Sequence, residues 1–538
     1  MTLPSGRWRR ALIVGVVTLF ACGAATVSLT RSDDRSGILP YSAPDVVNPM
    51  RGQFDNILTG LFPQSNEANR DLPAWPGTRD AALRFTWRSL QPVDPAGLPA
   101  DAPDDERYDF SVIDRALDAY EARGMRLTLR ISSYDSCCEQ LQPGDVNIGV
   151  PDWLAARDGA VDRYDRDGTV QVIPDWNSVA YLDGFTSLLD ALGRRYDGDE
   201  RLAIFEMSGY GDFSENVLPV LRDDLDTPGP DEEVSEEVLG YYSQYRDQFI
   251  TAASARRLVD ANLRAFPRTQ MLTAPGNALI VKELMRDSDA LDDVVHPVGI
   301  RSDCLGVQQV LPTWATDPSS EYVKRGDPII DVVKRRLVEA PVVTEWCQLP
   351  AGESPRDYYR RGLATVIDQH VSMTASSGFP DQLADDEMKP ELYDLWSRAN
   401  TFAGYRYDAQ ATVSTGPNRV TGAVVWTNRG VSSTHERWAV RYQLRSSDGE
   451  VVAEASSDLD LRQIDTDQDG DDVPTAATHT DTVAFDVDLD PGGYTVTTLV
   501  SWDEHKAGAT HTVDLGPMRL AMTDRVDGAY EIGRLTVR

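Results

Sequence analysis

The chain has 538 residues, 41% of them hydrophobic, so it can bury a large core and form more than one domain. Its formal net charge of -34 argues against a nucleic-acid-binding surface, because phosphate binding needs clustered Lys and Arg. An acidic surface favours neutral or cationic ligands, although keeping the protein soluble is a sufficient reason for the charge.

The N-terminus has the features of an export signal. A basic region, residues 7–10, precedes an apolar run over residues 11–29. We expect residues 1–30 to be a signal peptide or membrane anchor and residues 31–46 to be a flexible linker. Signal cleavage, a retained anchor and lipidation at Cys22 remain alternatives. In each of them the protein is secreted or anchored to the outer face of the cytoplasmic membrane.

Short β-rich segments alternate with helical patterns between about residues 48 and 378, which is typical of βα units around a parallel sheet. The eight predicted strands are the segment around Met50–Phe54, then Leu83–Trp87, Arg126–Ser132, Leu202–Ser208, Gln270–Ala274, Pro297–Asp303, Val342–Trp346 and Val371–Ala375. Amphipathic helices are predicted over Ser111–Arg123, Val179–Arg195, Glu237–Phe266 and Tyr358–His370. Eight strands with interleaved helices predict a (β/α)8 barrel, the TIM-barrel fold, over residues 47–402.

Two long inserts follow the third and fourth predicted strands, over Tyr134–Asn177 and Val217–Glu236. Loops at the C-terminal ends of barrel strands build the active site, so we expect these inserts to line it. Trp153, Trp176 and Trp314 therefore become candidate platforms on which a sugar ring could stack. Packing in the core is the competing explanation for each of them.

After about residue 401 the helical periodicity stops and alternating strands begin. Examples are Arg419–Thr427, Arg437–Arg445 and Tyr494–Trp502, which are separated by turn sequences such as SSDGE and DPGG. This pattern predicts a C-terminal β-sandwich over residues 403–538, which either binds carbohydrate or supports the barrel.

A DxDxDG sequence in the predicted sandwich, with Asp465, Asp467 and Asp469, is similar to the start of a calcium-binding loop. The twelfth position of such a loop would be Ala476, where an EF-hand has Glu. A solvated acidic hairpin is the alternative to a structural calcium ion. We expect no other cofactor, because there is no phosphate-binding loop and no histidine pair with metal-ligand spacing.

Four cysteines follow the signal region, namely Cys137, Cys138, Cys304 and Cys347. An even number in an exported protein predicts disulfide bonds. Cys304 and Cys347 end neighbouring predicted strands and are the candidate pair, although the sequence leaves the pairing open.

Acidic residues close two of the predicted barrel strands. The segment RLAIFEMSGYGDFSEN, residues 201–216, runs from the fourth strand into a glycine-rich turn with Glu206, Asp212 and Glu215, and PVVTEWC ends the seventh strand with Glu345. Two carboxylates from two strands of one barrel are the minimum needed to cleave a glycosidic bond, one as acid and one as nucleophile or base.

We assign Glu215 as the acid/base, because apolar and like-charged neighbours help a carboxyl group to keep its proton. Glu345 is assigned as the nucleophile, which must stay ionised, and Arg84 and Arg130 are the candidates for favouring its charged form. Other roles remain open, since Glu206 could pair with a barrel arginine and Asp212 could be a turn residue. The candidate substrate-binding residues are Glu206, Arg84, Trp87, Arg130, Tyr210, Asp212, Asp303, Trp314 and Trp176.

Several segments together resemble a known group of proteins. They are RFTWRSLQP at residues 84–92, PDWNSVAYLDGF at 174–185, the strand-and-turn segment above, VGIRSDCLG, VVTEW, and WTNRGVSSTHERWAVRYQL in the predicted sandwich. They resemble exported bacterial barrel-plus-sandwich proteins of unknown function that carry a Gly-Glu-Trp-His motif and are related to clan A glycoside hydrolases of the β-galactosidase and cellulase kind. The resemblance covers nearly the whole mature chain.

This resemblance implies a retaining glycoside hydrolase that acts on an extracellular poly- or oligosaccharide. Glu215 matches the Glu of the family motif, Glu206 matches an earlier acid, and Glu345 occupies the place of the clan A nucleophile. Ser214, Asn216 and Val217 stand where the family has Gly, Trp and His. That departure leaves open two further readings, a non-catalytic glycan-binding or cell-envelope protein on the same scaffold, and an envelope scaffold that binds no sugar.

Overall fold

The computed structural model describes residues 53–55, 80–136, 141–166, 168–217, 250–290, 294–307, 309–346, 349, 351–375, 390–465, 474–523 and 525–538. Several predictions lie outside these residues: the N-terminal signal or anchor and its linker, nearly all of the insert Val217–Glu236, Cys137, Cys138, Cys347, Asp467 and Asp469.

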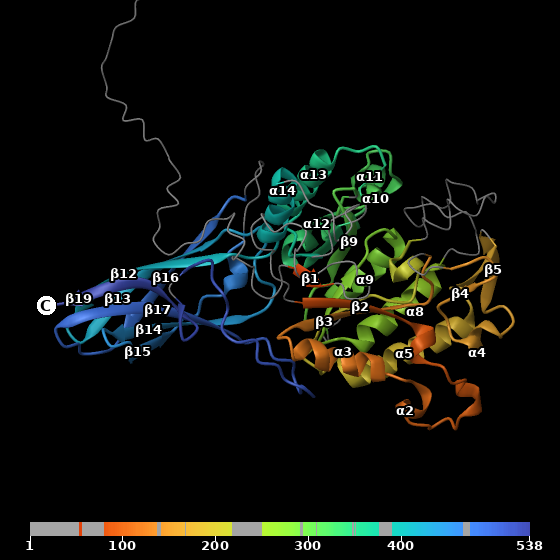
Figure 1. Ribbon diagram of the computed structural model, residues 1–538, viewed down its shortest axis with the longest axis horizontal. Helices are drawn as coiled ribbons and strands as arrows, with labels where there is room; N and C mark the ends of the chain where they lie inside the picture. The colour runs from red at the N-terminus through yellow and green to blue at the C-terminus, as the bar shows by residue number, and fades with distance from the viewer. Residues whose placement is uncertain are drawn as a thin grey trace, which may run out of the picture.

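Eight parallel strands close into a barrel in the order β1-β11-β10-β9-β8-β7-β3-β2 (Figure 1). They are β1 Gln53–Asp55, β2 Asp80–Thr86, β3 Arg126–Ser132, β7 Leu202–Glu206, β8 Gln270–Thr273, β9 Gly299–Leu305, β10 Val342–Trp346 and β11 Met373–Ala375. Every residue of β3 and β7 is buried, as expected for parallel strands that are covered on both faces. The predicted (β/α)8 fold is confirmed, and each predicted strand overlaps an observed one.

Amphipathic helices surround the barrel. The longer ones are α3 Ser111–Glu121, α5 Val179–Tyr196, α8 Ala252–Ala265, α9 Ala278–Ala290, α12 Ile329–Glu339, α13 Pro355–Asp368 and α14 Pro390–Phe402. Short helices are α1 Trp87–Leu90, α2 Asp104–Arg107, α4 Asp152–Ala155, α10 Thr313–Thr316 and α11 Glu321–Arg325. Helix α3 buries Ile113, Leu117 and Tyr120, which follow helical spacing along one face. Helix α8 begins at Thr251, whose side chain accepts a hydrogen bond from Ser254 N.

The insert after β3 contains a small sheet that the sequence did not reveal. Its strands are β4 Val146–Ile148, β5 Val161–Arg166 and β6 Thr169–Pro174, and β6 lies in the middle. In Figure 1 this sheet and the C-terminal sandwich lie at opposite ends of the barrel. The insert therefore covers the end at which the barrel strands finish.

The C-terminal part of the chain forms two antiparallel sheets that pack as a sandwich. One sheet has the order β12-β13-β16, and the other has the order β15-β14-β17-β19-β18. The strands are β12 Tyr407–Gly416, β13 Arg419–Asn428, β14 Trp438–Ser446, β15 Val451–Ser456, β16 Ala477–Phe485, β17 Gly492–Trp502, β18 Arg525–Val526 and β19 Ala529–Val537. Its core includes Trp426, Tyr442 and Val496. The predicted β-sandwich is confirmed.

The sandwich docks on the end of the barrel at which the strands begin. Arg126, the first residue of β3, donates a hydrogen bond from Nη1 to Glu436 Oε1 in the sandwich at 2.8 Å. The C-terminal ends of the strands are thus left to the βα loops, where barrel enzymes carry their active sites. Of the helices in the described ranges, none has the length and hydrophobicity needed to cross a membrane.

Candidate active site

Five charged residues from the barrel strands and one loop form a continuous series of ion pairs, which we call the ion-pair ladder: Glu215, Arg130, Glu206, Arg301 and Glu345. Arg130 on β3 lies 3.1 Å from Glu215 (Nη1 to Oε1) and 3.4 Å from Glu206 (Nε to Oε2). Arg301 on β9 lies 3.2 Å from Glu206 (Nη1 to Oε1) and 2.7 Å from Glu345 (Nη2 to Oε2). Closure of the barrel therefore brings together the two acids assigned to catalysis and links them through shared arginines.

Burial differs along the ladder. The side chain of Glu206 is only 5% exposed and lies between the two arginines, which are themselves buried. The side chains at the two ends, Glu215 and Glu345, are 20% and 23% exposed. Glu206 is thus a buried counter-ion, in agreement with the ion-pair alternative, whereas Glu215 and Glu345 remain accessible to a substrate.

A tight and conformationally strained loop presents Glu215. After β7 the chain turns through Gly209 and Gly211 with φ of 110° and 86°, and three residues other than glycine also have positive φ: Phe213 at 53°, Ser214 at 59° and Asn216 at 62°. Each such residue costs about 1–3 kcal/mol, and such strain collects at functional sites. The loop is held to the neighbouring strands of the barrel.

The bonds that hold this loop come from both flanking strands. Ser214 Oγ donates to Ile131 O on β3 at 2.7 Å, and Asn216 Nδ2 donates to Thr273 Oγ1 on β8 at 3.1 Å. Ser214 and Asn216 are the two sequence neighbours of Glu215. They anchor the loop in which Glu215 lies.

Asp212 in the same loop is a buried carboxyl group and not a solvent-facing turn residue. Its Oδ1 accepts a hydrogen bond from Ser136 N at 2.8 Å, whereas its Oδ2 has no hydrogen-bond partner among the described residues. Burial raises the pKa of Asp212 to about 7, the nearby charge of Asp135 adds to this, and Arg84 opposes it. The burial of Asp212 argues against its predicted contact with substrate.

Of the two arginines named from the sequence as candidates for favouring the charged form of Glu345, Arg130 pairs with Glu215 and Glu206. Arg84 Nε pairs with Asp135 at 3.3 Å, and its guanidinium lies over the ring of Phe213 at 4.5 Å. The arginine within 2.7 Å of Glu345 is Arg301, which we did not single out from the sequence. An arginine inside a predicted parallel strand of the barrel is a signal that could have found it, because a buried guanidinium needs a carboxylate partner.

The aromatic candidates lie in the core, in agreement with the packing alternative, and their burial argues against a contact with sugar. Trp87, Trp176, Trp314 and Tyr210 are all buried. Trp176 packs edge-on against Tyr210 with ring centroids 5.3 Å apart, and Trp314 Nε1 donates to a backbone carbonyl at 2.8 Å. Trp153 is half-buried and its Nε1 also donates to a backbone carbonyl. Trp87, Trp176 and Tyr210 share one hydrophobic cluster with Val172 and Ile173 of the small sheet, whereas Trp314 belongs to a second cluster and packs against Tyr322.

Three further candidates can be located only in part. Asp303 lies in β9, and its side chain is outside the described part of the structure. Cys304 is disulfide-bonded, while its predicted partner Cys347 lies outside the described residues. Among the described residues no group of His, Cys, Asp or Glu is arranged to hold a metal ion. Of the predicted calcium ligands only Asp465 is described, so that site stays a prediction.

Comparison with known proteins gives similarity at the level of fold. No model of a protein family and no curated protein matches the sequence. Similar solved structures include a β-galactosidase from the psychrophilic Marinomonas ef1 (12% identity, 60% of this chain and 55% of that chain, TM-score 0.31). They also include an endo-1,4-β-mannanase from Rhizomucor miehei (10%, 65% and 94%, TM-score 0.34) and the catalytic domain of the major endoglucanase from Xanthomonas campestris pv. campestris (12%, 60% and 84%, TM-score 0.29).

The chain thus spans about half the length of the β-galactosidase. Identities and TM-scores this low carry no argument about activity, and the resemblance to the Gly-Glu-Trp-His family stays a prediction. The case for a function has to come from the ion-pair ladder itself.

Proposed function

We propose that the protein is a retaining glycoside hydrolase that cleaves an extracellular poly- or oligosaccharide, with Glu345 as nucleophile and Glu215 as acid/base. The observation that carries this proposal is the ion-pair ladder, in which two accessible carboxylates at the C-terminal ends of barrel strands flank a buried, doubly paired glutamate. An extracellular substrate is proposed because of the N-terminal export sequence.

The contacts of the ladder distinguish its three carboxylates. Glu206 is buried between Arg130 and Arg301, whereas Glu345 lies 2.7 Å from Arg301 and Glu215 lies 3.1 Å from Arg130. A nucleophile must be ionised and a general acid must hold a proton, so we assign the first role to Glu345, which has the shorter arginine contact, and the second role to Glu215.

The steps follow from these positions. Glu345, paired with Arg301, attacks the anomeric carbon as a carboxylate while Glu215 gives its proton to the leaving oxygen, which yields a glycosyl-enzyme and a free alcohol. Glu215 then takes a proton from water, which attacks the same carbon and releases Glu345. The loop with positive φ at Ser214 and Asn216 holds Glu215 in place for both steps.

The test is a hydrolysis screen with chromogenic glycosides and cell-wall polysaccharides. We expect the wild type to turn over at least one of them, and Glu345→Gln and Glu215→Gln each to reduce kcat at least 100-fold. Glu450→Gln, at an exposed position of the sandwich, is the matched control and should keep full activity. NMR of the first product should show the anomeric configuration of the substrate.

The results of this screen distinguish a retaining hydrolase from an inverting hydrolase and from a glycan-binding protein. Inversion of the anomeric configuration would leave a hydrolase but remove the nucleophile role of Glu345. Binding of a polysaccharide without turnover, equal in the wild type and in Glu345→Gln, would show a glycan-binding protein that has lost the chemistry. Absence of both binding and turnover over the whole screen contradicts the proposal.

A further inference from the structure

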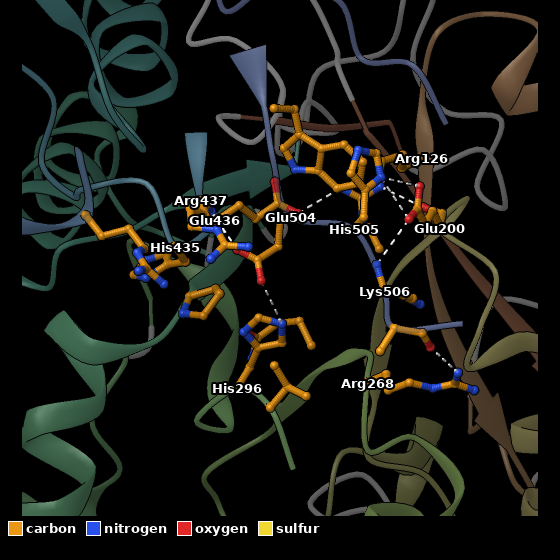
Figure 2. A pocket seen from close by; sticks show the side chains of 17 residues that line it. Arg126, Glu200, Arg268, His296, His435, Glu436, Arg437, Glu504, His505 and Lys506 are labelled. Atoms are coloured by element: carbon orange, nitrogen blue, oxygen red, sulfur yellow. Dashed lines mark hydrogen bonds and ion pairs between the residues drawn. The ribbon is translucent and has the colours of Figure 1, made fainter. Parts of the chain in front are cut away.

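A cavity of about 320 Å³ lies between the barrel and the sandwich (Figure 2). It is at the end of the barrel where the strands begin, opposite the end that carries the ion-pair ladder. Its barrel wall includes Arg126 and Gln270, the first residues of β3 and β8. Its sandwich wall consists of residues 435–437, just before β14, Arg462, and residues 502–507, at the end of β17 and beyond. This volume is at the lower end of the range for small-molecule sites, about 300–1,000 Å³, so it suits a molecule of monosaccharide size.

The walls of the cavity are held rigidly across the two domains. Glu200 of the barrel is fully buried and accepts hydrogen bonds from the backbone N–H groups of Lys506 and Val513 in the sandwich, at 3.1 and 3.0 Å. His505 Nδ1 lies 3.1 Å from the same carboxylate. Lys506 Nζ donates to Thr269 Oγ1 at 2.7 Å and to two backbone carbonyls of the barrel. Such a site is pre-formed, which lowers the entropic cost of binding a ligand.

Two arginines that line the cavity have hydrogen-bonding capacity to spare. Arg126 is only 4% exposed, and it donates from Nε to a backbone carbonyl at 2.9 Å and from Nη1 to Glu436 at 2.8 Å. Arg268 donates from Nε to Asp197 and from Nη1 to a backbone carbonyl, both at 2.7 Å. Within the described part of the chain, Nη2 of each arginine makes no hydrogen bond. A guanidinium nitrogen with an open donor position can bind an anionic acceptor in the cavity.

The carboxylates of the cavity, in contrast, are already engaged. Glu200 and Glu436 take part in the contacts above, and Glu504 accepts a hydrogen bond from Arg437 N at 2.7 Å and lies 3.9 Å from His296 Nε2. The lining has five Lys or Arg side chains and three Glu, whereas the chain as a whole has 52 basic and 86 acidic residues. Lys and Arg side chains thus outnumber acidic side chains in the lining of the cavity.

We propose that this cavity binds a small organic anion, a molecule of about monosaccharide size whose carboxylate or phosphate group accepts hydrogen bonds from Arg126 and Arg268. Guanidinium groups bind both kinds of oxyanion through paired N–H donors. The aromatic ring of Trp502, which lies 5.2 Å from the guanidinium carbon of Arg126, adds an apolar surface beside the charge. The site is separate from the proposed glycosidase centre and does not depend on it.

The test is calorimetric titration of the full chain with three ligands that share one sugar ring: glucose, glucuronate and glucose 6-phosphate. We expect at least one of the two anions to bind at least tenfold more tightly than glucose. A preference for glucuronate identifies a sugar acid, and a preference for glucose 6-phosphate identifies a sugar phosphate; both support the site.

Charge reversal locates the binding. Arg437→Glu changes a 59% exposed side chain that lines the cavity, and Arg419→Glu, at 55% exposure on β13, is its matched control. We expect Arg437→Glu to weaken binding of the anion at least tenfold and Arg419→Glu to leave it unchanged. Glu345→Gln should also leave it unchanged, because that residue belongs to the other end of the barrel.

Three results would overturn the proposal: no heat from either anion up to the limit of solubility, equal binding of glucose and the anions, or equal affinity in Arg437→Glu and Arg419→Glu. Loss of anion binding in Glu345→Gln would assign the binding to the ion-pair ladder and likewise contradict it. Failure of the glycosidase screen has no bearing on these results.

Discussion

Replacement of Asp212 by Asn is expected to stabilise the protein, and to do so only at neutral and alkaline pH. The carboxyl group is buried beside Asp135, and its pKa rises from the ordinary value of 3.8 to about 7. At about 1.4 kcal/mol per pH unit this difference corresponds to at most about 4 kcal/mol. When folding raises the pKa of an acid, the contribution of that group to the free energy of unfolding is fully present below the unfolded pKa. This contribution is lost as the pH rises through the folded pKa.

The wild type therefore loses up to about 4 kcal/mol relative to Asp212→Asn between about pH 4 and pH 7, and the difference stays constant above that range. Asparagine keeps the acceptor for Ser136 N, so the two proteins should be nearly equal at pH 4. Urea denaturation at a series of pH values measures the difference, and Asp448→Asn in an exposed turn is the control. A difference between Asp212→Asn and the wild type that does not change between pH 4 and pH 8 would refute the reasoning.

Three further changes test other parts of the structure. Glu206→Gln leaves Arg130 and Arg301 buried without their shared counter-ion. It should lower the free energy of unfolding, measured by urea denaturation, by about 3–5 kcal/mol. The control Glu450→Gln should change the free energy of unfolding by less than about 0.5 kcal/mol. Burial lowers the pKa of Lys506 to about 7. The stability of the wild type relative to Lys506→Met should therefore rise between about pH 7 and pH 10, by up to about 1.4 kcal/mol per pH unit. A difference in melting temperature between the two proteins that stays constant across that range would contradict this. Trp176→Ala should destabilise the barrel by about 3–5 kcal/mol in thermal denaturation, because the ring packs in the core. The folded variant should bind sugar as tightly as the wild type. A loss of sugar affinity without a loss of stability would instead support the predicted role of Trp176 as a sugar platform.

Part of the candidate site could be predicted from sequence and part could not. Glu206, Glu215 and Glu345 were found because a polar residue at the end of an apolar strand must lie at the edge of a parallel sheet. Their partners were not found, since an ion pair depends on distances between strands far apart in the chain. Arg301 and Glu206 are 95 positions apart and yet meet across the barrel.

The role of the aromatic residues could not be predicted from the sequence either. The sequence around a tryptophan in a long polar insert has no periodicity that shows whether the ring is a sugar platform or a core residue. Its role depends on which residues pack against it in the folded protein. For Trp176 that neighbour is Tyr210, which lies in the loop after β7. The sheet formed by β4, β5 and β6 was missed for a related reason, because its strands are short and one of them has only three residues.

The sequence by itself determined the order and type of the elements, and through them the barrel and the sandwich, because local periodicity and turn residues act over a few positions. Only the tertiary structure decided which carboxylates stay accessible and which are locked between arginines. It also created the basic cavity, whose walls come from residues such as Arg126 and Lys506, about 380 positions apart in the sequence. Burial and ion pairing are properties of the closed barrel and its contact with the sandwich, and no short segment of the chain contains them.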